Sequence, residues 1–252
     1  MADYETFAPA PFTFVVMPLV LVGLLAWGTA EAWNRSGVGR AAARRVAILT
    51  ATAGAGWMAL TWTTARSGIL REWDRNPPPL MFLVVAIVTL AVVIAHSRLG
   101  TRIVATIPLW VLVLVQAFRL PLELAMHGMY ERGIMPVQLS YSGLNFDIIT
   151  GITAILVAFL TATRRAGPMV VAGWNLLGLA LLINVVTVAI LATPRFRYFG
   201  DDHLNIWVTY PPFVWLPAVM VLAALAGHLL IFRALLRTRA QRSTAIGRAQ
   251  TN

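Results

Sequence analysis

The stretch that decides the fold is residues 103–129, which read IVATIPLWVLVLVQAFRLPLELAMHGM. It is apolar over a length that can cross the roughly 30 Å hydrocarbon core of a bilayer as a helix. One face of that helix nevertheless carries four polar or ionisable side chains, at spacings of three, four and four residues: Gln116, Arg119, Glu123 and His127. Ionisable groups inside a membrane segment are costly and usually face a bundle interior or a wet cavity. The stretch therefore indicates a membrane helix with a functional face.

Six other stretches are long and apolar enough to cross a bilayer: residues 12–33, 46–64, 79–97, 146–163, 169–193 and 212–236. Of the 252 residues, 59% are hydrophobic and 12% are charged, about half the charged share of a typical soluble domain. Backbone groups in lipid must bond within their own segment, which favours helices. We predict an all-α membrane protein, with a bundle of seven transmembrane helices at residues 1–237. A basic, disordered cytoplasmic tail is predicted at 238–252.

The arginines predict the orientation of the chain. Thirteen of the twenty fall in the short loops and the tail on one side of the predicted spans, whereas that side holds a single acidic residue, Glu31. Because basic loops stay in the cytoplasm, we predict the N-terminus outside and the C-terminus inside. The segment before the first span carries Asp3 and Glu5 and no basic residue, unlike a cleavable signal peptide. The expected location is a bacterial-type cytoplasmic (inner) membrane, as a multi-pass protein.

Missing residue types exclude several chemistries. The chain has no lysine, so covalent retinal, which needs a Schiff base, is excluded. It has no cysteine, which excludes disulfides, thiolate catalysis, iron–sulfur clusters and covalently attached c-type haem. A net charge of +10 often indicates nucleic-acid binding, but here the arginines lie beside the spans, where they act as topology signals. We therefore expect no nucleic-acid partner.

The main candidate site lies at the outer ends of the fourth and fifth predicted helices. Arg119 and Glu123 are four residues apart and can form an ion pair that simply braces the bundle. Pro121, between them, removes a backbone hydrogen bond and predicts a kink. In the functional interpretation these side chains line a polar pocket that opens outward. Arg119 then holds an anionic group, and Glu123 or His127 moves protons.

Asn145 and Asp147 stand at the start of the fifth predicted helix. Asn145 is a plausible N-cap, which places Asp147 in the first turn, where a negative charge suits the helix dipole. Asp147 could complete the pocket, or it could be a second partner for Arg119. We predict five ligand-binding residues: Arg119, Glu123, His127, Asn145 and Asp147. If the protein is catalytic, Glu123 and His127 are the candidate acid and base.

Two runs carry a resemblance. FRLPLEL at 118–124 and GLNFDIITG at 143–151 are similar to the corresponding runs of a family of small multi-pass bacterial membrane proteins whose activity is uncharacterised. The resemblance covers only the middle of the chain. It implies that Arg119, Glu123, Asn145 and Asp147 are signature positions, and it implies no activity, cofactor or substrate.

Metal and haem sites are weaker hypotheses. His127 and His203 are expected on the outer side near several carboxylates, but zinc needs three or four ligands, and the histidine-rich motifs of seven-helix membrane hydrolases are missing. His96 and His228 are expected near the inner ends of the third and seventh helices, at depths that would suit a b-type haem. Because lone histidines beside basic loops are more often interfacial, we predict neither a metal nor a haem.

The sequence therefore favours a membrane protein that binds a small molecule or a lipid headgroup in the polar pocket. Two alternatives remain open: a membrane enzyme acting on a lipid or isoprenoid, and a structural or accessory subunit of a membrane complex. The expected partners are the lipid bilayer, one small-molecule or lipid ligand and, for an accessory subunit, other membrane proteins.

Overall fold

The computed structural model describes residues 12–250, with side chains described up to residue 239. Six of the described helices are long and apolar enough to cross a membrane: Thr13–Arg35 (α1), Arg40–Arg66 (α2), Pro79–His96 (α3), Leu109–Glu131 (α5 to α6), Pro168–Leu191 (α8) and Leu216–Arg239 (η6 and the start of α9). A further apolar helix, Ile148–Ala162 (α7), is shorter at 15 residues. No strand occurs in the described part of the chain. The protein is thus an all-helical, multi-pass membrane protein.

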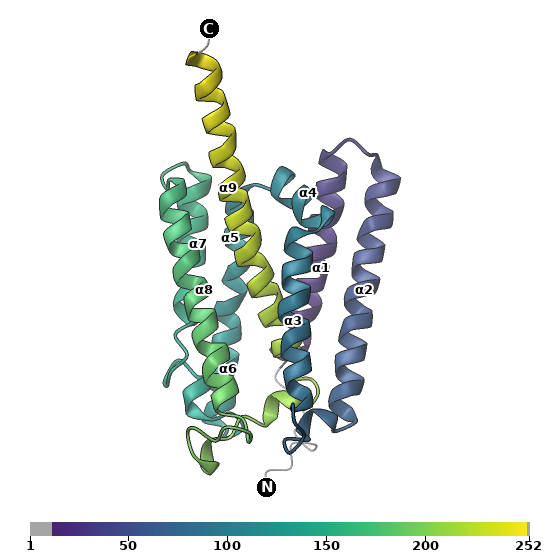
Figure 1. Ribbon diagram of the computed structural model, residues 1–252, viewed down its shortest axis with the longest axis vertical. Coiled ribbons are helices and arrows are strands. Elements are labelled where there is room, and N and C mark those ends of the chain that lie inside the picture. Colours follow the sequence, from purple (N-terminus) through teal and green to yellow (C-terminus); the bar gives the residue numbers. More distant parts are fainter. Residues whose placement is uncertain (1–11, 251–252) are drawn as a thin grey trace.

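The long helices lie side by side along one axis (Figure 1). Helix α9, Leu222–Gln250, contacts both α3 and α8 and projects beyond the other helices at one end (Figure 1). Its backbone stays helical through residues 238–250, the segment predicted to be a tail. Helices α1 and α2 form a hairpin at one edge of the bundle (Figure 1).

The predicted span 103–129 is two separate segments. Helix α4, Arg98–Thr106, is capped by Ile107, and α5, Leu109–Val115, begins after Pro108. Ile107 is extended, as expected for a residue before proline. Helix α4 lies at one end of the bundle, where it packs on α1 and α3 (Figure 1). The prediction that this span begins at residue 103 was therefore wrong, because the apolar run hides a chain break at the proline.

The same crossing is interrupted again near its centre. Residues Gln116–Phe118 form one 3-10 turn (η2) between α5 and α6, Arg119–Glu131. Pro121 has no N–H to donate to the Ala117 carbonyl, so regular helical bonding fails at this point. The interruption lies just before Pro121, where a kink was predicted, and it places Arg119 at the first position of α6.

The connection between α6 and α7 folds into the bundle instead of lying on its surface. Eight of its residues are buried: Ile134, Met135, Pro136, Gln138, Leu139, Ser140, Asn145 and Asp147. Helix α7 is short, about 22 Å at the usual rise per residue, so it begins part-way along the bundle. Non-helical backbone at membrane depth is tolerated only where protein or a cavity surrounds it. The connection therefore needs internal partners for its carbonyl groups.

Amide side chains supply those partners. Asn145 Nδ2 donates to the Leu139 carbonyl at 3.0 Å, within the connection itself. Asn184 Nδ2 of α8 donates to the Leu144 carbonyl at 2.7 Å. Buried backbone groups without partners are costly, so these side chains stabilise an otherwise unfavourable path of the chain.

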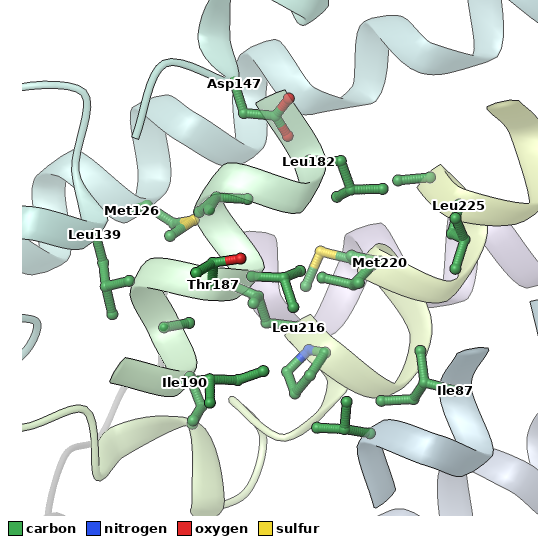
Figure 2. A pocket seen from close by; sticks show the side chains of 18 of the residues that line it. Ile87, Met126, Leu139, Asp147, Leu182, Thr187, Ile190, Leu216, Met220 and Leu225 are labelled. Carbon is green, nitrogen blue, oxygen red and sulfur yellow. The ribbon is translucent and has the colours of Figure 1, made fainter. Parts of the chain in front are cut away.

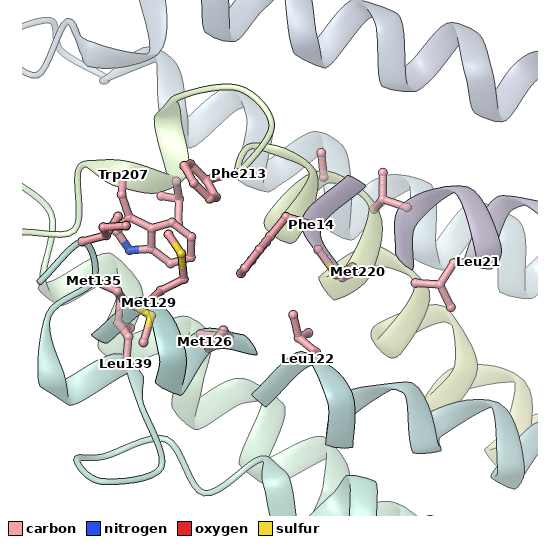
Figure 3. Close-up of a cluster of buried hydrophobic side chains, with 14 of the residues drawn as sticks. Phe14, Leu21, Leu122, Met126, Met129, Met135, Leu139, Trp207, Phe213 and Met220 are labelled. Carbon is pink, nitrogen blue, oxygen red and sulfur yellow. The ribbon is translucent and has the colours of Figure 1, made fainter. Parts of the chain in front are cut away.

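An aromatic cluster closes the end of the bundle opposite α4. Phe14 of α1 meets Trp207 and Phe213 edge to face, with ring centroids 5.7 and 5.4 Å away (Figure 3). Met126 and Met129 of α6 pack in the same cluster (Figure 3). These contacts fix the loop between α8 and α9 against the bundle.

Helix α9 is preceded by a π-helical segment, η6, Leu216–Val221, which contains Pro217. Proline is a common cause of irregular bonding in a helix, which accounts for the irregular start of this span. Trp57 Nε1 of α2 donates to the Ala218 carbonyl in η6 at 2.8 Å. In return, Trp215 Nε1 donates to the Met58 carbonyl of α2 at 3.0 Å. Two reciprocal tryptophan bonds thus join α2 to η6.

Candidate functional site

A buried ion pair lies at the centre of the bundle. Arg119 Nη1 is 2.6 Å from Asp147 Oδ1, and the two side chains are 1% and 6% exposed. The same Nη1 donates to the Gly178 carbonyl of α8 at 3.3 Å. Arg119 and Glu123 do not form the predicted ion pair within 4 Å, because the buried connection brings Asp147 to Arg119 instead. Of the two partners considered for Arg119, the structure selects Asp147.

Glu123 is buried beside this pair and has a different partner. Its Oε2 accepts a hydrogen bond from Asn145 Nδ2 at 2.7 Å. Asn145 Oδ1 accepts the Asp147 backbone N–H at 3.0 Å. This hydrogen bond closes a turn that precedes α7, and the N-cap residue of α7 is Asp147. The prediction that Asn145 is the N-cap was therefore wrong. Asn145 instead joins the two acidic residues of the site.

The charges of this centre do not balance. It contains one guanidinium, Arg119, and two carboxyl groups, Glu123 and Asp147. Within residues 12–239, Glu123 has no cation within 4 Å. A buried carboxylate without a counter-ion is strongly disfavoured. Glu123 is therefore the group in this centre that most needs a proton or a cation.

A cavity of about 240 Å³ adjoins the charged centre (Figure 2). Arg119, Glu123 and Asp147 are part of its lining. Most of the remaining lining is apolar and comes from α3, α8 and the η6–α9 segment, for example Ile87, Leu182 and Met220 (Figure 2). For comparison, ligand pockets are typically about 300–1,000 Å³, and a water molecule occupies about 30 Å³. The space suits a slender, mainly apolar molecule.

The cavity is elongated and reaches the outer surface of the bundle. Along α8 its lining runs from Leu182 to Ile190, about 12 Å at the helical rise per residue. Two of its lining residues, Val88 of α3 and Ile183 of α8, are 46% and 58% exposed. The cavity therefore opens between α3 and α8, on a face where apolar side chains are exposed.

His127 lies outside this cavity. Its Nδ1 is 2.8 Å from Ser140 Oγ, and its Nε2 is 3.5 Å from a carboxylate oxygen of Glu131. Its ring stacks on Tyr141 at 4.3 Å between centroids. Of the five predicted ligand-binding residues, Arg119, Glu123 and Asp147 line the cavity. Asn145 is hydrogen-bonded to Glu123 but does not line the cavity, and His127 belongs to a separate cluster.

The two histidines considered for haem lie in different surroundings. His228 of α9 is fully buried, and its Nδ1 is 2.8 Å from Asn175 Oδ1 of α8. Asn175 Nδ2 donates to the His228 carbonyl at 3.1 Å, so the pair joins α8 to α9. His96 is exposed, with Nδ1 3.0 Å from the Val92 carbonyl. Neither histidine lines the cavity.

His203, the other weak metal candidate, lies in the exposed turn Asp201–His203 (η4). No hydrogen bond or ion pair of the described residues joins it to His127; its carbonyl accepts a hydrogen bond from Gln138 Nε2 at 2.7 Å. Among the described residues, no group of three or more His, Asp or Glu side chains is placed to hold a metal ion.

Sequence reasoning missed the other end of the cavity. Asn205 and Trp207, from the loop between α8 and α9, are buried and line it there. In the sequence they stand in a long loop with several aromatic residues, which resembles ordinary interfacial anchoring. Only the folding of that loop back onto α8 reveals their position.

No protein-family model, no curated protein and no solved structure matches this chain. The resemblance of residues 118–151 to a bacterial family stays a prediction. The function is therefore argued from the geometry of the cavity.

Proposed function

We propose that this chain is a seven-span protein of a bacterial-type cytoplasmic membrane that binds an amphipathic, cationic small molecule in the cavity between α3, α8 and α9. In this topology α7 and the buried connection before it form the additional crossing. The N-terminus is then outside and the C-terminus in the cytoplasm. Helix α1 begins and α9 ends at opposite ends of the bundle, which supports an odd number of crossings (Figure 1).

The arginines support the orientation. The end of the bundle where α4 lies carries a group of basic side chains at helix ends and in short connections: Arg35, Arg40, Arg44, Arg45, Arg98, Arg102, Arg164 and Arg165. The opposite end has longer loops with acidic residues. By the positive-inside rule the α4 end faces the cytoplasm. The cavity then lies in the outer half of the membrane.

One observation carries the choice of ligand: Glu123 lines an apolar cavity and has no cation within 4 Å among the described residues. A ligand with an ammonium group would supply the missing charge, and its apolar body would fill the slot along α8. Arg119 Nε and Nη2 have no hydrogen-bond partner among the described residues, but Asp147 already neutralises the charge of Arg119 and Glu123 would repel an anion. An anionic ligand, the expectation from Arg119, is therefore disfavoured. A proton at Glu123 takes the place of the cation when the site is empty.

The opening between α3 and α8 suits this class of ligand. An amphipathic amine partitions into the bilayer, where its apolar part is stabilised. It can then reach the cavity sideways, past Val88 and Ile183. Burial of each methylene contributes about 0.8 kcal/mol, so the apolar body supplies affinity and Glu123 supplies selectivity for charge.

The test is binding of matched linear probes to the purified protein in lipid nanodiscs. Decylamine and decanoate have the same chain and opposite charge. We expect decylamine to bind with one-to-one stoichiometry and decanoate to bind much more weakly, and Glu123→Gln to abolish the difference. Glu131→Gln is the matched control, since Glu131 stands on the same helix, is exposed and does not line the cavity. Equal binding of both probes, or an unchanged preference in Glu123→Gln, would overturn the proposal.

A second candidate rests on the buried ion pair. Arg119 and Asp147 connect α6 to the start of α7 and, through the Gly178 carbonyl, to α8. In a structural or accessory subunit, this pair is a brace and the cavity holds ordinary lipid. Native mass spectrometry separates the two candidates: a stoichiometric small mass supports the ligand-binding protein, and a retained protein partner supports the subunit.

A further inference from the structure

The outer end of the cavity contains two buried polar atoms with no hydrogen-bond partner among the described residues. They are Asn205 Oδ1 and Trp207 Nε1. Their residues are 2% and 0% exposed, and both line the cavity. Buried polar groups are paired in the great majority of cases, so two unpaired atoms in one cavity lining call for a common explanation.

Both side chains are held in place by the protein. Asn205 Nδ2 donates to the Ala189 carbonyl at 3.0 Å, which fixes the orientation of the amide and leaves Oδ1 as the unpaired atom. The Asn205 backbone N–H donates to the Ala192 carbonyl at 2.8 Å. The ring of Trp207 is fixed edge to face against Phe14 and Phe213 (Figure 3). The two free atoms are therefore preorganised for a partner.

Their chemistry selects that partner. Trp207 Nε1 can only donate a hydrogen bond, and Asn205 Oδ1 can only accept one. A carboxylate or phosphate would be repelled by the amide oxygen, and an ammonium group would be repelled by the indole N–H. A hydroxyl group or an amide carries both a donor and an acceptor and is uncharged. A neutral group of this kind can satisfy both atoms.

The distance between the two polar ends sets the length of the ligand. Arg119 bonds the carbonyl of Gly178 and Asn205 bonds that of Ala189, eleven residues further along α8. That separation is about 17 Å, and Glu123 lies about one helical turn nearer to Asn205 than Arg119 does. The lining between the ends is mainly apolar.

We infer that Asn205 and Trp207 form a second subsite of the cavity, which binds an uncharged hydroxyl or amide group of the ligand. The inference rests on the proposed function: the cationic group lies at Glu123 and an apolar chain joins the two ends. The ligand class is thus an elongated molecule with an amine at one end and a neutral hydrogen-bonding group at the other.

The experiment compares aminodecanol with decylamine on the full-length protein in nanodiscs. In the wild type we expect the hydroxyl group to strengthen binding about five- to tenfold, the effect of one or two neutral hydrogen bonds. Trp207→Phe keeps an aromatic ring but loses the pyrrole part of the indole with its N–H, so the advantage of aminodecanol should fall about fivefold while decylamine binds as before. Trp174→Phe is the matched control, because that N–H is bonded to the Thr153 hydroxyl outside the cavity.

A ligand-side comparison needs no variant and covers the case in which Trp207→Phe does not fold. The methyl ether of aminodecanol keeps the acceptor and loses the donor for Asn205, so it should lose part of the advantage. In a series from hexyl to dodecyl, amino alcohols should bind best at an intermediate length, whereas simple amines should bind more tightly with every added methylene.

The outcomes separate the two proposals. If decylamine binds and the hydroxyl group adds nothing, the subsite is wrong and the proposed function stands. An equal loss for both probes in Trp207→Phe means that the ring only packs, which also overturns the subsite. If neither probe binds the wild-type protein, the proposed function fails, and the subsite fails with it.

Discussion

Arg119 of α6 and Asp147, the residue before α7, form an ion pair that is almost completely buried, with 2.6 Å between Nη1 and Oδ1. They come from opposite sides of a non-helical connection that folds into the bundle. The pair therefore fixes the depth at which α7 begins. Through the Gly178 carbonyl it also fixes the position of α8, whose side chains form one wall of the cavity.

Removing either partner should destabilise the protein strongly. Arg119→Leu leaves the Asp147 carboxylate buried without its counter-ion, and Asp147→Leu does the same to the guanidinium. Each change should lower the free energy of unfolding by about 3–5 kcal/mol. The double variant should lose much less than the sum, since neither member of this pair is left without its partner. Unfolding by SDS titration in mixed micelles measures all three. Strictly additive losses would show that the pair is not coupled.

Binding of decylamine should weaken as the pH falls, because a proton and the ammonium group compete for Glu123. The affinity should drop by up to about tenfold for each pH unit once protonation dominates. The slope should vanish in Glu123→Gln and persist in Glu131→Gln. Titration calorimetry at several pH values provides the measurement. A slope that survives in Glu123→Gln would assign the competing proton to another group.

Gly151 of α7 marks the closest approach of α6 and α7. A Cβ at this position would lie 2.4 Å from the backbone nitrogen of Leu120, which cannot move without its helix. Gly151→Ala should therefore cost at least about 1–3 kcal/mol of stability, the usual penalty for overpacking. On α6, a Cβ at Gly128 meets nothing within 4 Å, so Gly128→Ala should be neutral or stabilising by up to about 1 kcal/mol. Thermal unfolding of the two variants side by side checks the contrast; similar melting temperatures would contradict it.

Asn145 should matter more than other amides of the bundle. It bonds Glu123, the Leu139 carbonyl and the Asp147 N–H, so Asn145→Ala should cost about 3 kcal/mol at about 1 kcal/mol for each hydrogen bond. Asn184→Ala loses one bond to the same connection and should cost about 1 kcal/mol. Hydrogen exchange of residues 132–147 should accelerate far more in the first variant. Equal protection in both would mean that Asn145 does not hold the connection.

The natural absence of cysteine makes the proposed seven-span topology directly testable. Single cysteines at Ser67 and Ser142 should react with a membrane-impermeant maleimide in intact cells. Cysteines at Ser36 and Thr163 should react only after the membrane is opened. All four side chains are exposed. Labelling of Ser142→Cys and Thr163→Cys from the same side would show that α7 does not cross the membrane.

The sequence predicted the helical class and most of the long apolar helices, because hydropathy over about 20 residues is a local property. It also singled out Arg119, Glu123 and Asp147, because charges are rare in apolar segments. The break at Pro108 was missed since the apolar run continues across it. Proline itself was the available signal, as Ile107 adopts the extended conformation that precedes a proline.

Long-range relationships were not accessible in this way. The partner of Arg119 depends on how deeply residues 132–147 enter the bundle, and polar residues in that connection resemble those of an ordinary outer loop. Asn205 and Trp207 reach the cavity only because their loop folds back onto α8. No local pattern places either of them beside α3, so the second end of the cavity emerges only from the tertiary structure.

The reciprocal tryptophan bonds between α2 and η6 link the edge of the molecule to its interior. Helix α2 packs mainly on α1, yet the bond from Trp57 to Ala218 and the bond from Trp215 to Met58 join it to the π-helical segment. The same segment supplies Leu216, Pro217 and Met220 to the cavity wall. Any displacement of the α1–α2 hairpin at this end must stretch those two hydrogen bonds or move the η6 wall of the cavity with it. A displacement of the hairpin is therefore expected to change the width of the cavity.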